Sequence, residues 1–320
     1  RRSVRILEQA GDVWEKHQAQ YQVAASLYQL GRFTEAVKLS RQAYDSGLAY
    51  GDDQACANII EGWARATNGD IPEEIIQREI ERPRNDIQAI GHVMLARGVQ
   101  LMNEGELTQA IDTFQEGIDV TRAGGISNCY TAPLHAWKAT ALRTYLENAS
   151  PVIRRTRQKT IRRHRWSARM ALMMAMRFRS ELPHALRELA WGFVFQNKIR
   201  RAMLTLRWSI RAARIQNARW EQLQGEEMLQ QIRVEYGRAG ATEALEEVHH
   251  RMSVFRNEQL PKRVPTSFSL LDRFESLLDA GRAIASALEP ADIISATRTA
   301  SQQLLRSDFC RIVPLDADGL

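Results

Sequence analysis

Apolar residues recur three and four positions apart through most of the 320-residue chain, and this spacing is the period of an α-helix. Nine prolines and eighteen glycines fall at intervals rather than throughout. Ala, Leu, Arg, Gln and Glu, which favour helices, dominate the composition. Alternating runs typical of strands are absent until about the last dozen residues. The pattern predicts an all-α protein.

A short motif recurs in the first half, in which a helix is followed by a glycine, a bulky apolar residue and an alanine. Its positions are Gly31, Phe33 and Ala36 in one copy and Gly105, Leu107, Ala110 and Phe114 in another. The glycine can adopt a left-handed conformation without steric cost. The bulky residue can close the end of a helical hairpin, and the alanine lets two helices cross closely. A degenerate copy around Gly69 lies midway between them, which indicates helical repeats.

These residues resemble the tetratricopeptide repeat family, most clearly over residues 17–46 and 91–124. Gln20 and Met94 stand where that family usually has a large residue early in the first helix. The resemblance implies an α-solenoid of antiparallel helical hairpins. Each hairpin of such an array contacts only its neighbours, so we expect a flexible rod.

The second half continues this architecture with longer helices. Asn197 stands in for the turn glycine, because Asn tolerates the left-handed conformation, and Ala202 follows at the crossing position. Residues 151–180 predict one or two helices, with a candidate break at Trp166-Ser167. Over the whole array, hairpin turns are predicted near residues 31, 69, 105, 148, 197 and 239.

The chain changes character after residue 256. Residues 257–269 contain Pro261 and Pro265 in a polar stretch, which predicts a linker. An amphipathic helix over residues 270–288, a second helix from Pro290 to Leu305 and a strand over residues 309–315 are expected to follow. We therefore expect three parts, namely a helical repeat domain at 1–256, a linker at 257–269, and a linker helix with the truncated start of another domain at 270–320.

This last part is similar to the start of a GAF domain, a small α/β sensor module of bacterial signalling proteins. The order of repeats, linker and GAF-like start resembles the central part of large bacterial multidomain signalling proteins. That resemblance implies a kinase or ATPase-type module upstream and a sensor with an output enzyme downstream. The chain begins as if in mid-helix, without Met, so we expect it to be a piece of such a polypeptide.

The resemblance implies a non-catalytic protein–protein interaction and coupling scaffold. We expect its partner to be a protein or peptide, above all the neighbouring domains of the same polypeptide. A groove lined by the first helix of each hairpin is the expected binding surface, around Leu27, Tyr28, Leu101, Asn103 and Phe193. Two alternatives are a purely structural spacer that binds nothing and a basic helical surface that binds nucleic acid or another polyanion.

Charge is concentrated in one segment. The net charge is +6, yet ten Lys or Arg and no Asp or Glu lie between residues 154 and 179. Contact with an acidic partner is predicted for Arg154, Arg155, Arg157, Lys159, Arg162, Arg163 and Arg165. Trp166 could stack on a base, but no groove-reading motif favours nucleic acid.

A plainer interpretation, which we favour, is that this segment is an ordinary helix with one buried stripe. The stripe would consist of Val152, Ile153, Thr156, Thr160 and Ile161. The arginines would then be solvated or paired with the acidic residues Glu226, Glu227, Glu246 and Glu247. The methionines Met170, Met173, Met174 and Met176 are either an adaptable peptide-binding surface or, as we favour, part of a buried helix. Trp191, Trp208 and Trp220 are expected in the core.

Catalytic, cofactor and metal sites are not predicted. The seven histidines are scattered, and the adjacent His249 and His250 point to different faces of a helix. Cys56, Cys129 and Cys310 have no CxxC spacing, so we expect buried free thiols in a reducing cytoplasm. No phosphate-binding glycine motif and no apolar run of about 20 residues occurs, so neither nucleotide nor membrane contact is expected.

Overall fold

The computed structural model describes residues 2–148, 154–259, 293–295 and 297–298. It separates the chain into two compact units, residues 1–262 and 263–320. The described residues form helices and turns without any strand, so the all-α prediction is confirmed for them. None of the helices in these ranges is both long enough and apolar enough to cross a membrane.

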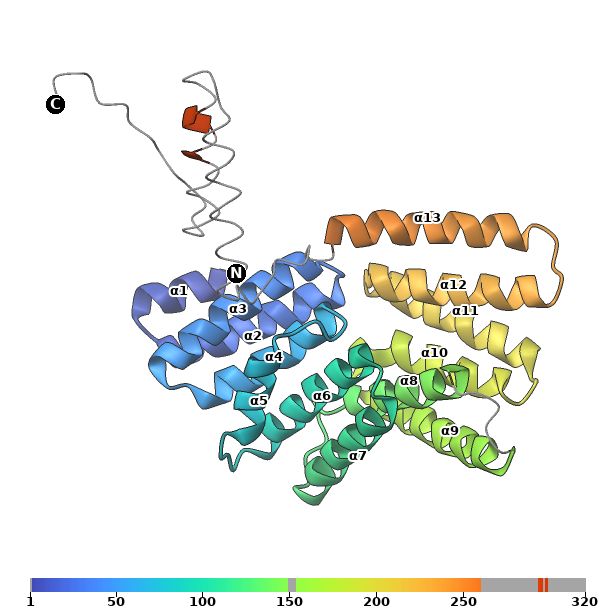
Figure 1. Ribbon diagram of the computed structural model, residues 1–320, viewed down its shortest axis with the longest axis horizontal. Coiled ribbons are helices and arrows are strands. Elements are labelled where there is room, and N and C mark those ends of the chain that lie inside the picture. The colour runs from blue at the N-terminus through green and yellow to red at the C-terminus, as the bar shows by residue number, and fades with distance from the viewer. Residues whose placement is uncertain (1, 149–153, 260–292, 296, 299–320) are drawn as a thin grey trace. The chain divides into compact units, whose positions relative to one another are not determined.

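The first unit is a succession of helices joined by short connections (Figure 1). They are α1 (Arg2–Ala10), α2 (Val13–Gln29), α3 (Phe33–Tyr50), α4 (Asp53–Ala66), α5 (Glu73–Glu81), α6 (Ile87–Glu104), α7 (Leu107–Ala123), α8 (Pro133–Asn148), α9 (Arg154–Arg177), the 3-10 turn η1 (Arg179–Glu181), α10 (Leu182–Val194), α11 (Ile199–Ile215), α12 (Arg219–Glu235) and α13 (Ala241–Gln259).

These helices form two layers. Helices α2, α4, α6, α8, α10 and α12 make an inner row in which each contacts the next. Helices α3, α7, α9 and α11 each pack from outside against the two inner helices that flank them in the sequence, and α13 packs against α12. The inner row thus carries one face that no outer helix covers.

Local sequence explains where many helices begin and end. The helices α2, α4 and α6 each begin after an aspartate, Asp12, Asp52 or Asp86, whose side chain accepts a hydrogen bond from a backbone N–H of the first turn. The turn residues Gly31 and Asn197 have φ angles of 75° and 57°. This left-handed region favours Gly and, among other residues, Asn.

The repeat positions lie where helices press together. Ala36, Ala110 and Ala202 are fully buried, with 0% of each residue exposed. A β-carbon added at Gly98 would lie 2.3 Å from the ring of Phe114, so α6 and α7 pack with no room for a side chain there. The remaining repeat positions Gly31, Phe33 and Leu107 are buried, whereas Gly105 is exposed in its turn with a φ angle of 84°.

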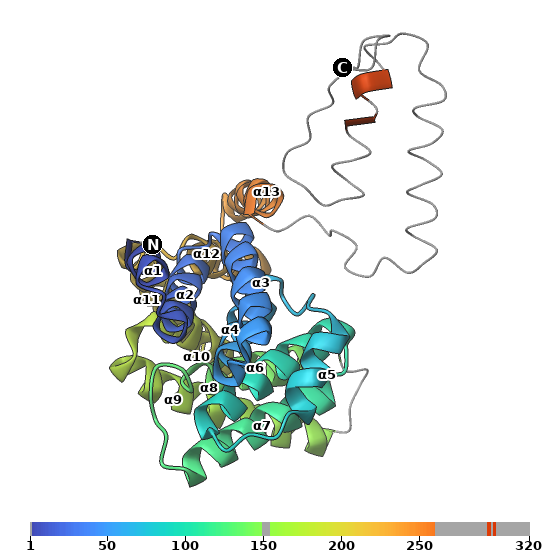
Figure 2. The ribbon, with the colours of Figure 1, turned by 90° about the vertical axis from the view of Figure 1, so that its left-hand side faces the viewer.

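The first unit curls back on itself, which the expectation of an open rod did not include. The ring of Phe33 lies 5.7 Å from that of Phe255 in α13 and 6.2 Å from that of Trp220 in α12. The Thr34 hydroxyl donates to the backbone carbonyl of Gln259, 225 residues away, at 2.9 Å. In Figures 1 and 2 the C-terminal end of α13 lies close to the hairpin of α2 and α3. The end of the array therefore packs against its beginning.

Helix α9 runs unbroken through Trp166, so the one-helix alternative is correct there and the candidate break at Trp166-Ser167 is absent. Helix α13 continues to Gln259, so the first residues of the predicted linker are helical. The rest of that linker, the amphipathic helix over 270–288 and the strand over 309–315 lie outside the described residues, and residues 293–295 and 297–298 are helical.

Candidate functional site

The uncovered face of the inner row encloses a cavity of about 430 Å³. Its wall carries the aromatic residues Tyr28, Phe33, Trp137 and Trp220. It also carries the polar residues Arg65, Asn68, Asn103, Thr140, Arg143, Thr144, His184, Arg187, Glu221, Gln224 and Arg256. These residues come from all six inner helices, from the connection after α4 and from the outer helices α3 and α13. The cavity is the place where the whole first unit converges.

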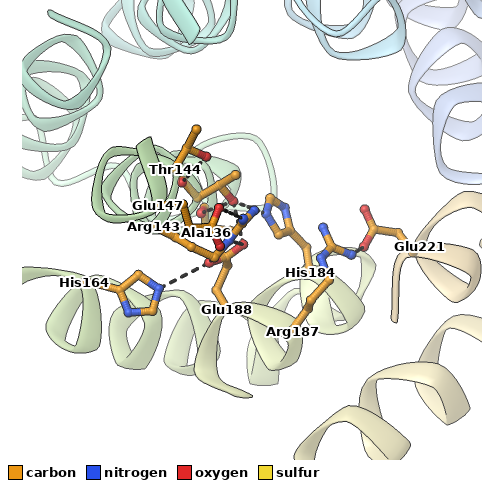
Figure 3. Close-up of polar contacts among 10 residues, drawn as sticks. Ala136, Arg143, Thr144, Glu147, His164, His184, Arg187, Glu188 and Glu221 are labelled. Carbon is orange, nitrogen blue, oxygen red and sulfur yellow. Dashed lines mark hydrogen bonds and ion pairs between the residues drawn. The ribbon is translucent and has the colours of Figure 1, made fainter. Parts of the chain in front are cut away.

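A buried carboxylate, Glu188 of α10, organises one side of the cavity (Figure 3). It accepts hydrogen bonds from the Thr140 hydroxyl at 2.9 Å and from Nε of Arg143 at 3.3 Å. Nε2 of His164 in α9 lies 3.2 Å away. Burial alone would raise the pKa of Glu188, but Arg143 and His164 outweigh it and hold that pKa well below its usual range. The carboxylate is thus charged and fully engaged.

Its neighbour His184 is buried and neutral. Burial, reinforced by Arg187, lowers the pKa of His184 to about 4. Nε2 of His184 lies 2.8 Å from the Thr140 hydroxyl, which has only one proton. If that proton goes to Glu188, the stronger acceptor, His184 must donate from Nε2 to Thr140. A chain of three residues, His184, Thr140 and Glu188, then fixes the tautomer of the imidazole.

The two buried arginines of the wall are also neutralised, whereas Arg256 is exposed. Arg65 bonds Glu61 and, at 2.9 Å, Glu181, and its guanidinium lies 4.3 Å above the ring of Tyr28. Arg187 forms an ion pair with Glu221 of α12, which joins two inner helices (Figure 3). Because burial penalises an isolated charge heavily, these pairs are what allow arginines in the wall. The cavity is polar but nearly balanced in charge.

Three side-chain amides of the wall remain available. Asn68, Asn103 and Gln224 make no side-chain hydrogen bond within the described part of the chain. Amides both donate and accept, so they match the alternating groups of a peptide backbone. Tyr28 and Trp220 lie beside them in the same wall. The wall is suited to binding a polar chain segment flanked by apolar side chains.

The titratable side chains of this cavity are engaged with one another. Its carboxylates are held by arginines, and its histidine is tied to Thr140. Within residues 2–148 and 154–259, no three His, Cys, Asp or Glu residues are grouped so that they could hold a metal ion. Of the cysteines, Cys56 is buried, whereas Cys129 is exposed, contrary to the expectation of buried thiols. Cys310 lies outside the described residues.

The residues predicted for partner binding separate into two groups. Tyr28 and Asn103 line the cavity. Leu27 and Leu101 are buried in the core, and Phe193 packs against the apolar cluster shared by α10, α11 and α12. Leu27 directly precedes Tyr28 and so lies about 100° around the helix from it. Two of the five predicted residues thus line the cavity, and the other three pack in or against the core.

The basic segment lies on the outer helix α9. Arg157, Lys159, Arg162 and Arg163 are exposed, and Arg165 is half-buried. No Lys or Arg of α9 from Arg157 to Arg177 forms an ion pair with a carboxylate in the described ranges. Arg154 and Arg155 begin the same helix.

The favoured interpretation of this segment is correct only in part. Thr160 and Ile161 are buried as expected, but Thr156 is exposed, and Val152 and Ile153 lie outside the described residues. Three of the four acidic residues that were expected to neutralise it have other partners. Glu226 pairs with Arg214 and Arg251, Glu227 pairs with His249, and Glu247 pairs with Arg251.

Several features were missed. Trp208 is 56% exposed, so its assignment to the core is wrong. Met173 and Met176 are exposed, whereas Met170 and Met174 line a groove. The network around Glu188 was not predicted, although its spacing of four from His184 on one helix face was a local signal.

The chain was also compared with known proteins. It matches no family model and no curated protein.

Proposed function

We propose that the first unit is a tetratricopeptide-like α-solenoid that acts as a non-catalytic protein–protein interaction scaffold. The recurring order of turn glycine, bulky residue and buried alanine supports this fold. So does the regular alternation of inner and outer helices. Stacked helix pairs of this kind present a concave surface, which such proteins use for binding.

The available amides of the cavity carry the proposal. Asn68, Asn103 and Gln224 face a balanced, mostly neutralised wall beside Tyr28 and Trp220. A strongly charged ligand would find no net attraction there. An extended peptide would satisfy the amides with its backbone and place apolar side chains against the rings, as in other protein interfaces rich in aromatic residues. The proposed ligand is thus an extended, nearly neutral segment of a protein.

We further propose that the scaffold couples domains of a bacterial multidomain signalling protein. In this arrangement it joins an upstream kinase or ATPase-type module to a downstream GAF-like sensor and output enzyme, and any catalysis belongs to those modules. The order of repeats, linker and GAF-like start in the sequence supports this proposal. The main rival is a spacer that only holds the modules apart.

Peptide selection distinguishes a scaffold from a spacer. A displayed library of random peptides is selected on the 320-residue chain, and the enriched peptides are titrated against variants. Asn103→Arg should weaken binding by at least about tenfold, because a long cation fills the cavity. Gln42→Arg makes the same change of charge at an exposed position of the outer helix α3, and should leave binding unchanged. Failure to enrich any peptide, or equal binding by both variants, would favour the spacer.

A further inference from the structure

A second concavity lies where α7, α8 and α9 meet. It measures about 330 Å³, near the lower end of ligand pockets, and shares no residue with the central cavity. One wall consists of Trp166, Met170 and Met174, which lie on successive turns of α9. Ile118 of α7 and Ile126 of the following connection complete an apolar floor. This groove, which we call the α9 groove, is therefore lined by soft, adaptable side chains.

The apolar surface continues along α9 beyond the groove. Trp166, Met173 and Met176 are 66%, 63% and 61% exposed. With Arg162 and Arg169 they form one stripe at helical spacing. From Arg162 to Met176 the stripe is ~21 Å long, at about 1.5 Å per residue. Contiguous exposed apolar residues of this kind mark interaction sites, and the length exceeds what a small molecule covers.

The rim of the α9 groove is cationic. Among the described residues no carboxylate lines it, whereas the cations Arg122 and Lys138 do. His135 also lines it, but burial lowers the pKa of this imidazole to about 4, so it is neutral. Burial, followed by the repulsion of Arg163, lowers the pKa of Lys138 more than Asp119 and Asp112 raise it. The ammonium donates to the Gln115 side-chain carbonyl and forms no ion pair in the described residues. Arg122 is the exception, since it pairs with Asp119. A carboxylate of a bound partner would reduce the electrostatic repulsion between these cations.

The positive charge extends over the neighbouring outer helices. Residues 154–219 contain eighteen Lys or Arg but only two acidic residues, Glu181 and Glu188. Both of these are buried and paired with Arg65 and Arg143, respectively. The exposed surface of this segment therefore carries cations without any acidic residue among its own side chains.

We propose that the α9 groove and stripe form a docking surface for an acidic amphipathic helix of a partner protein. One bulky apolar side chain of that helix fills the groove, and others pack along Trp166 and Met173. Its carboxylates contact Lys138, Arg162 and Arg163. A helix of about 14 residues has the length of the stripe, and laying an amphipathic helix on an apolar groove is a common mode of recognition. A nucleic acid would satisfy the arginines but would leave the methionines unused.

Fluorescence anisotropy on the full 320-residue chain tests the proposal. The probe is a labelled helical peptide of about 14 residues with Leu and Trp at i, i+3, i+4 and i+7 and Glu elsewhere. We expect micromolar binding, weakened at least about tenfold when the same residues are scrambled. A version with Lys in place of Glu should not bind. A thymidine oligonucleotide of similar length should bind more weakly than the acidic peptide.

Matched charge variants locate the site. Arg162→Glu, Arg163→Glu and Arg169→Glu together should weaken binding of the acidic peptide by at least about tenfold. Lys198→Glu, Arg200→Glu and Arg201→Glu make the same change on exposed residues of and beside α11, and should alter binding by less than about twofold. Circular dichroism verifies that both triple variants are folded.

Two further variants separate the groove from the charge and from the central cavity. Ser127→Trp adds a ring at an exposed residue of the groove wall, and should block the peptide while all charges remain. Asn103→Arg, in the central cavity, should have no effect, so failure of the function proposed above would leave this result intact. Absence of peptide binding, equal binding of the scrambled peptide, equal loss in both triple variants or tighter binding of the oligonucleotide would each overturn the proposal.

Discussion

The inner wall of the cavity and the outer face of α9 are both rich in arginine, but the arginines are paired with carboxylates only on the inner wall. On the inner wall, Arg65, Arg143 and Arg187 are each bonded to buried or half-buried carboxylates. On α9, Arg162 and Arg169 are exposed and have no carboxylate partner in the described residues. The chain thus contains arginines that are paired with carboxylates in one region and arginines without such partners in another.

Burial explains the difference. A buried guanidinium without a partner is strongly destabilising, so the inner wall can hold arginine only together with Glu. An exposed arginine is solvated, and pairing it would add little stability. The inner arginines are therefore part of the structure, whereas those of α9 are free to contact another molecule. Removing charges from the two regions should give effects of very different size.

The largest effect is expected from Glu188→Ala. It leaves the half-buried Arg143 and the buried His164 without their shared carboxylate, and loss of one member of a buried pair destabilises by about 3–5 kcal/mol. The matched change is Glu147→Ala, which removes the solvent-facing partner of the same Arg143. That variant should lose no more than about 1 kcal/mol. Urea unfolding of both variants measures the difference, and equal losses would show that Arg143 is not held from the buried side.

The next largest effect is expected in the pH dependence of the free energy of unfolding, to which His184 contributes. Its pKa is about 4 in the folded chain and 6.5 as an unperturbed side chain. Between these values the unfolded state binds a proton that the folded state does not, so stability is lost as the pH falls. At pH 5 this contribution amounts to about 2 kcal/mol relative to pH 7.

A difference between variants isolates this contribution. His184→Gln should remove about 2 kcal/mol of the stability lost between pH 7 and pH 5. The exposed His250→Gln should leave the full pH dependence. Measuring the free energy of unfolding of both variants at pH 7 and pH 5 tests this expectation. If both variants follow the wild type, His184 is protonated in the folded chain and the geometry around Thr140 is different.

A smaller effect is expected when charge is kept but shape is changed. Arg143→Lys retains the cation but loses the planar group that reaches both Glu188 and Glu147, and should cost about 1 kcal/mol. Arg169→Lys, on exposed α9, should change the free energy of unfolding by less than about 0.5 kcal/mol. Guanidinium-induced unfolding measures both. A neutral result for Arg143→Lys would mean that charge alone holds the inner wall.

The helices and their turns were readable from local patterns because their causes are local. A period of three to four residues makes a helix, and Gly31 and Asn197 adopt the left-handed conformation that their residue types favour. The burial of Ala36 and Ala110 follows from the same repeat. No local pattern in the sequence indicated that the array of helices curls back on itself. The contact of Phe33 with Phe255 depends on small rotations summed over all the intervening helix pairs.

The candidate site was readable only in part, for a related reason. Tyr28 and Asn103 were predicted because the inner helix of a pair can be recognised, but Leu27 and Leu101 show that its cavity face could not be separated from its core face. Pairing is harder still to predict. The partners of Glu188 lie 24, 45 and 48 residues away, and only the folded chain brings them together.

The smallest effect should come from removing charge on α9. Arg157→Gln, Arg162→Gln and Arg169→Gln together take away three exposed cations that have neighbours of like sign and no acidic partner in the described ranges. Stability should stay within about 0.5 kcal/mol of the wild type. Any gain should be largest at low ionic strength, because salt screens the repulsion that the wild type retains. Thermal melts at ~0.02 M and ~0.5 M salt measure this dependence. A large loss of stability, insensitive to salt, would instead show that these arginines hold the helix in place and would remove the contrast with the inner wall.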